Sequence, residues 1–235
     1  MIIKKINGRS QYNEDAIIEK IFENLKISKG VFFEIGVNNM TLDKSIQCNS
    51  INLINKGWKG KLVDANFEHP LVLNEFISIE NINEIAKLAG NKIDFFSIDI
   101  DSYDWHVIRE VLLKKIIDIN VFCVETNNYN GHCFLDRVLK LDAPAPNTKG
   151  NPKSDSFGAT TFAYNLLMVK YGYKLIATSD YGVNAFFVKE KFANLFPKAG
   201  KMRELYIDSN NLLTNWNKKG PSENMTMAQK LINQL

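Results

Sequence analysis

The stretch from Val31 to Asp64 constrains the fold more than any other part of the chain. Val31–Ile35 is a short apolar run that predicts a buried strand, and Gly36 follows it. From Leu42 to Ile54 the apolar residues recur near helical spacing, and Lys61–Asp64 predicts a second strand. A strand, a glycine turn, a helix and a second strand form a βαβ unit with parallel strands.

Polar residues in this unit indicate a nucleoside-containing cofactor. Asp64 ends the second strand, where dinucleotide-binding folds hold a ribose by its hydroxyls. The first turn keeps only Gly36, with Asn38 and Asn39 where a pyrophosphate cradle has glycines, and neither GxGxxG nor GxxxxGK[ST] occurs. An adenosine cofactor without phosphates, S-adenosylmethionine (SAM), therefore fits better than a dinucleotide or ATP. The competing interpretation is an ordinary βαβ unit with a polar turn.

Composition limits the class of protein. The chain has 235 residues, enough for one large α/β domain or two small ones, and its net charge of +3 is too balanced to indicate a nucleic-acid partner. Three cysteines without a CxxC pair predict neither a disulfide framework nor a zinc site. No apolar run reaches the length of a membrane span, and the first residues lack the apolar core of a signal peptide. We expect a soluble cytoplasmic protein and leave homo-oligomerisation open.

The rest of the chain extends the sheet. Helices are predicted over 13–25, after Asp101, and over 157–171. Further strands are predicted at Phe76–Ile79, Asp94–Ile100, Ile119–Val124, Tyr173–Thr178 and Ala185–Val188. The last two strands flank a short turn with glycine and form an antiparallel hairpin. The expected fold is α/β: a Rossmann-like, mostly parallel sheet that ends in an antiparallel hairpin, with helices on both faces, as in class I methyltransferases.

Acidic residues gather where the strand Asp94–Ile100 meets the next helix. Asp99, Asp101 and Asp104 lie within six residues, and His106 follows. In an open parallel sheet, ligands bind outside the carboxyl ends of the strands, so we expect this junction to lie at the active edge. Asp101 and Asp104 are also placed to cap the helix, but three carboxylates exceed what capping needs.

The pattern divides the chain into three parts. Residues 1–30 form an N-terminal helical segment packed on the core, residues 31–190 the cofactor-binding domain, and residues 191–235 a C-terminal helical extension. Within the domain, residues 140–157 are rich in proline, asparagine, glycine, serine and lysine. Because long structureless segments in compact domains often serve binding, we expect a substrate loop here, with a mere insertion as the alternative.

Several segments together resemble the FkbM-like branch of SAM-dependent methyltransferases over roughly residues 31–188. They are FFEIGVNN, CNS followed by NLINKGWKGKLVDAN, IDFFSIDIDSYDWHVI, VETNNYN and FGATTFAYNLLMVKYGYKLIATSDYGVNAFFV. The chain departs from the usual methyltransferase pattern by lacking the later glycines of the first turn. The resemblance implies methyl transfer to a hydroxyl of a sugar, a nucleotide-linked sugar or a surface-glycan precursor.

The resemblance also implies which residues contact the cofactor. They are Glu34 and Gly36 at the methionine moiety, Asp64 at the ribose hydroxyls, Ala65, Asn81 and Ile82 near the adenine, and Asn49 and Asp99 at the amino-acid end. Asn81 is equally well placed to cap the helix that follows it.

A hydroxyl acceptor must lose its proton during methyl transfer. A general base within hydrogen-bond reach is one device, with Asp101, Asp104 or His106 as candidates and His132 as a second histidine. A divalent metal that binds the hydroxyl is the other. Oxygen ligands suit Mg²⁺ or Mn²⁺, and the candidate set is Asp101, Glu125 and Asn127. We favour Asp101 as the key acid.

Two other classes of protein compete with this interpretation. The glycine-poor turn is compatible with a non-catalytic, nucleotide-sugar-binding accessory protein on a methyltransferase fold. A nucleic-acid methyltransferase is disfavoured by the balanced charge and by the lack of an Asn/Asp-Pro-Pro-Tyr signature.

Overall fold

The computed structural model describes residues 10, 12–37, 47–127, 135–142, 158–205 and 225–234. The strands are β1 Val31–Ile35, β2 Lys59–Asp64, β3 Val72–Asn74, β4 Lys92–Ile98, β5 Asp118–Glu125, β6 Val138–Leu139, β7 Tyr173–Thr178, β8 Asn184–Lys189 and β9 Met225–Thr226. The helices are α1 Glu14–Leu25, α2 Ile51–Asn55, α3 Ile82–Lys87, α4 Asp104–Lys114, α5 Thr161–Lys170, η2 Asp180–Gly182, η3 Glu190–Leu195, α6 Met202–Leu205 and α8 Ala228–Ile232.

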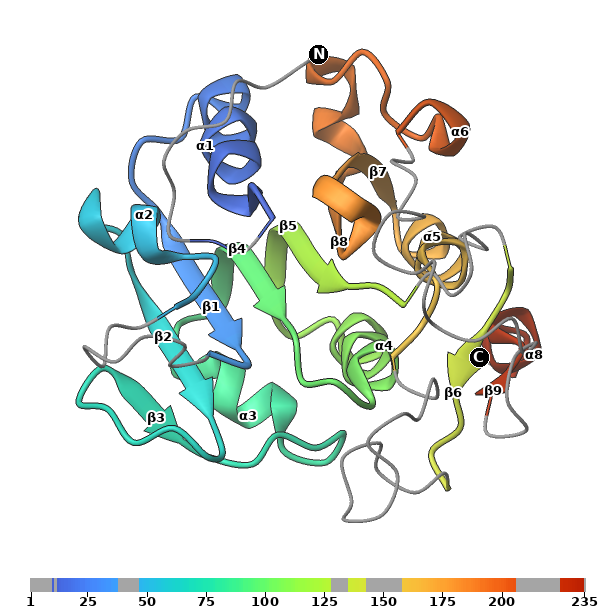
Figure 1. Ribbon diagram of the computed structural model, residues 1–235, viewed down its shortest axis with the longest axis horizontal. Coiled ribbons are helices and arrows are strands. Elements are labelled where there is room, and N and C mark those ends of the chain that lie inside the picture. Colours follow the sequence, from blue (N-terminus) through green and yellow to red (C-terminus); the bar gives the residue numbers. More distant parts are fainter. Residues whose placement is uncertain are drawn as a thin grey trace.

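The central sheet has seven strands in the order β3-β2-β1-β4-β5-β8-β7 (Figure 1). Neighbours from β3 to β5 are parallel, whereas β8 is antiparallel to both β5 and β7. This arrangement confirms the predicted mostly parallel sheet and its C-terminal hairpin. The chain runs outward from β1 through β2 to β3 and returns on the other side of β1 as β4, so a topological switch point lies between β1 and β4.

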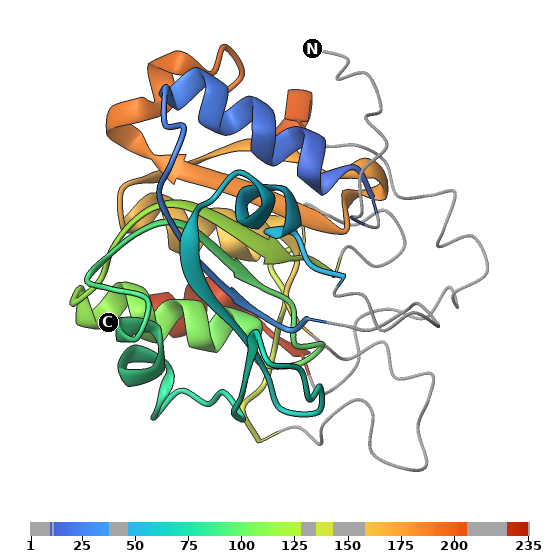
Figure 2. The same ribbon diagram turned by 90° about the vertical axis from the view of Figure 1, so that its left-hand side faces the viewer.

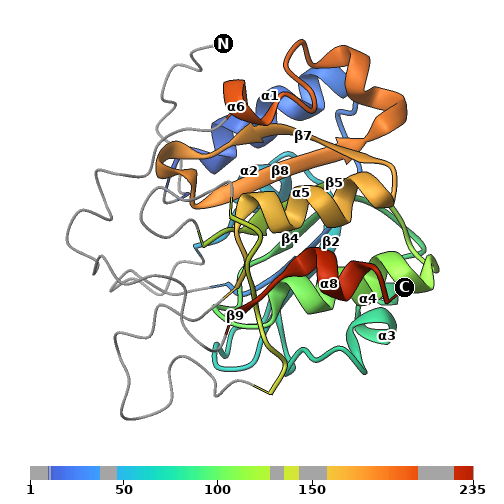
Figure 3. The same cartoon turned by 90° about the vertical axis from the view of Figure 1, so that its right-hand side faces the viewer.

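Helices cover both faces of the sheet, as predicted. Helices α1 and α2 lie on one face, and α3, α4, α5 and α8 lie on the other (Figure 2 and Figure 3). Adjacent residues of one strand point to opposite faces. Phe95 therefore packs in the core under α1, while Phe96 packs in the core under α4 with Trp105.

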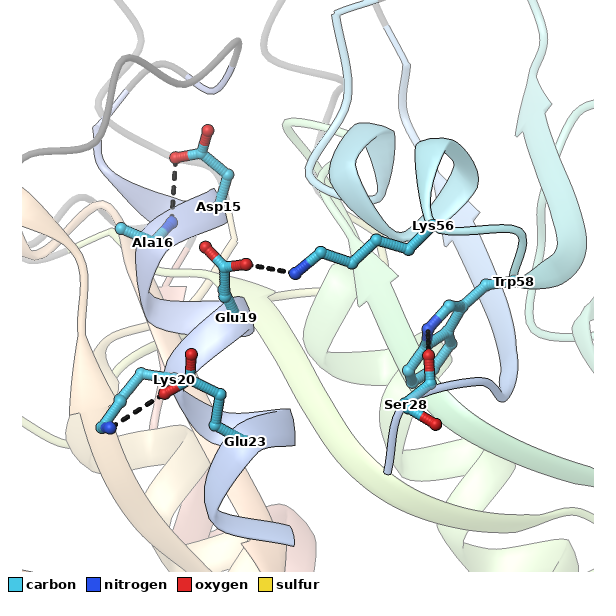
Figure 4. A network of polar contacts seen from close by, with 8 residues as sticks. All are labelled: Asp15, Ala16, Glu19, Lys20, Glu23, Ser28, Lys56 and Trp58. Carbon is cyan, nitrogen blue, oxygen red and sulfur yellow. Dashed lines mark hydrogen bonds and ion pairs between the residues drawn. The ribbon is translucent and has the colours of Figure 1, made fainter. Parts of the chain in front are cut away.

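Helix α1 fixes the N-terminal segment to the sheet. Ile17, Ile18, Ile21 and Phe22 form its buried stripe. Polar contacts surround this stripe (Figure 4): Glu19 of α1 forms an ion pair with Lys56 after α2, and the Trp58 indole donates a hydrogen bond to the Ser28 carbonyl at 3.1 Å. The described start of the chain is thus part of the same core as the sheet.

The described end of the chain also packs against the domain. Helix α8 lies beside α5, and β9 pairs antiparallel with β6. The Asp136 carboxylate accepts hydrogen bonds from the backbone N–H groups of Ala228 at 2.7 Å and Gln229 at 3.1 Å. Among the described residues, no helix has both the length and the apolar character that crossing a membrane requires.

The third strand lies earlier in the chain than predicted. The segment Phe76–Ile79 is irregular, and Val72–Asn74 forms β3 instead. Val72 pairs with Leu62 and Asn74 with Asp64, after which the Asn74 side chain donates to the Ala65 carbonyl at 3.1 Å and ends the ladder. Within the segment that was predicted as a strand, Ile77 is buried while Phe76 is 71% exposed.

The end of β4 and the start of α5 differ from the prediction because side chains accept hydrogen bonds from backbone N–H groups there. Strand β4 ends at Ile98 rather than Ile100, since the Asp104 carboxylate accepts from the N–H groups of Ile100 at 2.9 Å and Ser102 at 3.0 Å and holds a turn there. Helix α5 begins at Thr161 rather than at residue 157, because the Thr160 hydroxyl caps it by accepting from the Ala163 N–H at 3.2 Å.

The helix predicted over 42–54 is described only from residue 47 onward. There it begins at Ile51, so Asn49 lies in the turn before the helix and not on it. The cause is Glu34, whose two carboxylate oxygens accept from the backbone N–H groups of Asn49 and Ser50. Residues 38–46 lie outside the described part of the chain.

Candidate functional site

A cleft of about 1310 Å³ opens at the carboxyl ends of β1, β2, β4 and β5. Its described lining residues are Ser10, Tyr12, Glu14, Glu34, Ile35, Gly36, Val37, Gln47, Cys48, Asn49, Asp64, Ala65, Asn66, Phe67, Glu75, Phe76, Ile77, Ser78, Ile79, Glu80, Asp99, Ile100, Asp101, Ser102, Tyr103, Val107, Glu125, Leu141, Val183 and Asn184. The cleft spans the switch point between β1 and β4, where α/β sheets bind their ligands.

The turn after β1 is tightly enclosed. Gly36 has a φ of 82°, its N–H donates to the Val63 carbonyl at 3.0 Å, and the Asp99 N–H donates to the Ile35 carbonyl at 3.1 Å. A Cβ atom on Gly36 would lie 1.5 Å from the Asp99 carbonyl oxygen. Only glycine fits this position, and it brings the backbone of β1 against the end of β4.

Glu34 fixes the turn before α2. Its side chain is 2% exposed and accepts from the N–H groups of Asn49 at 2.6 Å and Ser50 at 2.7 Å. The Asn49 amide in turn donates to the Ser97 hydroxyl at 3.1 Å. Burial of the Glu34 carboxyl raises its pKa to about 7 against these hydrogen bonds. Glu34 and Asn49 both line the cleft, and Glu34 also supports its wall.

The raised pKa of Glu34 predicts a pH-dependent stability. Because the pKa is about 7 in the folded state and 4.5 in the unfolded state, ionisation disfavours folding: the contribution of this group is full below pH 4.5 and is lost as the pH rises through 7. The free energy of unfolding of wild type relative to Glu34→Gln should therefore fall by about 3 kcal/mol across this range, measured by urea unfolding. Glu84→Gln, at an exposed glutamate of α3, is the control, and a difference independent of pH would contradict the prediction.

Asp64 and Ala65 lie at the end of β2 and line the cleft. One carboxylate oxygen of Asp64 accepts from the Asn66 N–H at 2.7 Å, which closes a small Asx turn and fixes the side chain. Asp64 thus presents a carboxylate held in position at the end of the strand next to β1.

Asn81 and Ile82 do not line the cleft, although the preceding residues 77–80 do. The Asn81 side chain accepts from the Ser78 N–H at 2.8 Å and donates to the Phe76 carbonyl at 2.8 Å, so it closes its own loop. It makes no capping hydrogen bond to α3, and Ile82 is fully buried in the core. The geometry therefore gives these two residues a structural task, and their expected contact with the adenine stays a prediction.

Three carboxylates meet at the ends of β4 and β5. Oxygen atoms of Asp99, Asp101 and Glu125 all lie within 4.8 Å of one another, and one Glu125 oxygen is buried without a hydrogen-bond partner. Burial, reinforced by the mutual repulsion of the acids, raises the pKa of Asp99 and of Glu125 well above the usual carboxyl range. Asp101 has a φ of 55°, a left-handed backbone conformation that residues other than glycine rarely adopt.

This cluster contains two of the three predicted metal ligands, with Asp99 as its third member. Asn127, the remaining predicted ligand, is buried and does not line the cleft, and its N–H donates to the Ala159 carbonyl at 2.8 Å.

Asp104 and His106 do not line the cleft either. Asp104 is fully buried beneath the turn that it closes, and burial raises its pKa to about 6. His106 is 3% exposed, its Nε2 lies 2.7 Å from the Leu139 carbonyl, and burial lowers its pKa to about 4. The neutral imidazole therefore donates from Nε2 and links α4 to β6. Among the candidate bases, Asp101 alone lines the cleft; His132 and residues 143–157 of the expected substrate loop lie outside the described residues.

The sequence analysis did not identify Glu14 and Asn184, which line the end of the cleft near β5 and β8. Glu14 of α1 is 1% exposed and accepts from the Asn184 amide at 3.0 Å and from the Tyr12 N–H at 2.7 Å. Asn184 begins β8 and pairs with Glu125 of β5. The only local signal was the acidic start of an amphipathic helix, which is also typical of an ordinary helix N-terminus.

The strand order and the position of the cleft define a Rossmann-like α/β fold of the class I methyltransferase type. No protein-family model and no curated protein sequence matches the chain. Similar solved structures include three of the MycE methyltransferase from the mycinamycin biosynthetic pathway, all in complex with Mg and SAH and one also with mycinamycin VI.

Those three structures share 11–12% sequence identity with the chain and have TM-scores of 0.42–0.43. The alignments cover 74% of this chain and 48% of the others, so the chain spans about half the length of these methyltransferases. At TM-scores below 0.5, the likeness carries no information about what this chain binds.

Proposed function

We propose that the chain is a SAM-dependent methyltransferase that binds SAM in the cleft at the switch point. The observation that carries the proposal is that Gly36 and Asp64 line the cleft together at the ends of the adjacent parallel strands β1 and β2, which the hydrogen bond from the Gly36 N–H to the Val63 carbonyl holds side by side. A turn without a side chain lets a ligand approach the backbone, and a fixed carboxylate on the next strand suits the two ribose hydroxyls.

The lining favours a nucleoside without phosphates. Ala65, Asn66 and Phe67 follow Asp64 in the lining, which also contains Ile77 and Ile79. This set offers apolar and amide contacts to a base, while the described lining contains no basic side chain for a pyrophosphate. SAM has an adenine base for the apolar and amide contacts. It has no phosphate, and its positively charged sulfonium does not require a basic side chain.

The carboxylate cluster supports transfer to an oxygen. A hydroxyl must be deprotonated as it attacks the methyl group, and Asp101 is the cleft-lining candidate for a general base. The cluster Asp99, Asp101 and Glu125 also fits Mg²⁺ or Mn²⁺, because all three offer hard oxygen ligands and one Glu125 oxygen has no partner. When bound, such an ion lowers the pKa of a ligated hydroxyl.

The FkbM-like resemblance in the sequence supplies the acceptor class of this proposal. It implies a hydroxyl of a sugar, a nucleotide-linked sugar or a surface-glycan precursor. A role in carbohydrate modification, such as polysaccharide biosynthesis, follows from the same resemblance.

Calorimetry of SAM binding tests the proposal. Wild type should bind SAM, and Asp64→Ala should weaken binding by about tenfold or more, because a hydrogen bond to a charged group contributes about 1.5–3 kcal/mol. Asp118→Asn is the matched control, since this exposed acid lies at the opposite end of β5 in an ion pair with Lys189. A well-folded wild type that does not bind SAM would contradict the proposal and favour the nucleotide-sugar-binding accessory protein.

A further inference from the structure

The described lining of the cleft is acidic although the protein as a whole is not. The chain has 29 basic and 26 acidic residues. The described lining nevertheless contains eight acids and no lysine, arginine or histidine; the acids are Glu14, Glu34, Asp64, Glu75, Glu80, Asp99, Asp101 and Glu125. A cleft lined by one sign of charge concentrates ligands of the opposite sign and repels ligands of the same sign.

The end of the cleft away from Asp64 also offers hydrogen-bond acceptors. Glu125 and Asn184 pair across the antiparallel strands β5 and β8, so their side chains lie on the same face of the sheet. Both residues line the cleft, Asn184 is 5% exposed, and each has a buried oxygen without a hydrogen-bond partner. The Asn184 nitrogen is already used, because it donates to Glu14.

The acidic lining and the unpaired acceptors together favour ligands that donate hydrogen bonds. The free amide oxygen of Asn184 can only accept hydrogen bonds, and a carboxyl group keeps an accepting oxygen even where its pKa is raised, so the complementary ligand group is a donor: a hydroxyl or a protonated amine. A phosphate offers mainly acceptors and brings negative charge toward Asp99, Asp101 and Glu125. A phosphate also cannot donate to the buried oxygens of Glu125 and Asn184. These acceptors would stay unpaired in the complex, which weakens binding further.

We propose that the acceptor end of the cleft, formed by Glu14, Asp101, Glu125 and Asn184, takes a phosphate-free sugar rich in hydrogen-bond donors, best an amino sugar, and rejects nucleotide-linked sugars. The inference rests on the proposed function and narrows its acceptor class. The oxygens of Glu125 and Asn184 receive the donors, and the carboxylates balance the charge of the ammonium group.

Saturation-transfer NMR on the full chain with saturating SAH tests this inference. The probes are methyl glucosaminide, methyl glucoside and uridine diphosphate glucose, each with and without Mg²⁺. We expect the strongest signal from methyl glucosaminide, a weaker one from methyl glucoside and none from uridine diphosphate glucose. Equal signals from all three probes, including none from any, would overturn the proposal, as would a dominant signal from the diphosphate sugar in either condition.

Variants locate the effect in the cleft. Glu125→Gln should weaken binding of methyl glucosaminide by about tenfold. Asp101→Asn should weaken it as well, and this exposed position tolerates the change because asparagine adopts a left-handed conformation. Asp118→Asn should leave it unchanged, and an equal loss in all three variants would overturn the assignment. Failure to bind SAM would count against the proposed function, whereas absent sugar selectivity in a SAM-binding protein would count against this inference alone.

Discussion

Replacing Gly36 by alanine should destabilise the protein by about 3 kcal/mol or more and abolish SAM binding. The added Cβ would lie 1.5 Å from the Asp99 carbonyl oxygen, and the φ of 82° is unfavourable for any L side chain. The obstacle is backbone and not a flexible side chain, so the end of β1 or the end of β4 must move. Either movement separates Gly36 from Asp99 and so shifts a wall of the cleft that both residues line.

Gly57→Ala is the matched control for this prediction. Gly57 has nearly the same backbone conformation, with a φ of 79°, but no atom lies within 4 Å of an added Cβ. Its replacement should cost only about 1 kcal/mol, the penalty of a left-handed alanine. Urea unfolding gives both free energies, and calorimetry gives SAM binding. Similar losses in the two variants would mean that conformation, and not the contact with Asp99, explains the need for glycine at position 36.

The sequence predicted the central strands of the large sheet, which are buried on both faces, but it misplaced the edge strand β3 and did not predict the short pair β6 and β9. β4 and β5 are near-continuous apolar runs, because a central strand of a parallel sheet is covered by helices on each side. β3 has three residues at the sheet edge, none of them fully buried, so no apolar signal marks it. The apolar segment Phe76–Ile79 imitates a strand because Ile77 fills the core from an irregular segment.

The candidate site was predictable where it depends on strand ends. Gly36, Asp64 and Asp101 follow recognisable strands, and a parallel sheet brings such positions to one edge. The directions of helical side chains were not predictable: Asp104 and His106 follow Asp101 closely in sequence, but the turn that Asp104 closes carries both away from the cleft.

The contact between Glu14 and Asn184 illustrates a second limit. These residues are 170 positions apart, and neither belongs to a local pattern that indicates the other. Their meeting depends on α1 packing over the end of the β5–β8 pair, which is a property of the three-dimensional fold. Long-range polar contacts of this kind carry no periodicity that a single sequence reveals.

Asp101→Asn should lower the rate of methyl transfer by about 10²–10⁴-fold while SAM binding stays close to that of wild type. Asp101 is the exposed member of the carboxylate cluster, and asparagine keeps both its size and its left-handed backbone. The change replaces a carboxylate by a neutral amide. The side chain at position 101 can then neither accept a proton nor provide a negative charge for a cation. The rate is measured as SAH formed with the sugar that binds best, and Asp118→Asn, at the opposite end of β5, should keep the wild-type rate.

Chelation separates the two roles of Asp101. If the cluster of Asp99, Asp101 and Glu125 holds a divalent ion, removal of metal from wild type should lower the rate about as far as Asp101→Asn does, and Mg²⁺ or Mn²⁺ should restore it. If Asp101 acts as a general base without metal, chelation leaves the wild-type rate unchanged. The rate of wild type then increases with pH as the Asp101 carboxyl ionises, whereas the rate of Asp101→Asn does not. Although Asp101 is the most exposed of the three acids, partial desolvation of its carboxyl inside the cleft raises its pKa, so this increase occurs above the usual range of an aspartate. A fully active Asp101→Asn enzyme would contradict both roles, because neither a base nor an anionic ligand would then be needed at this position.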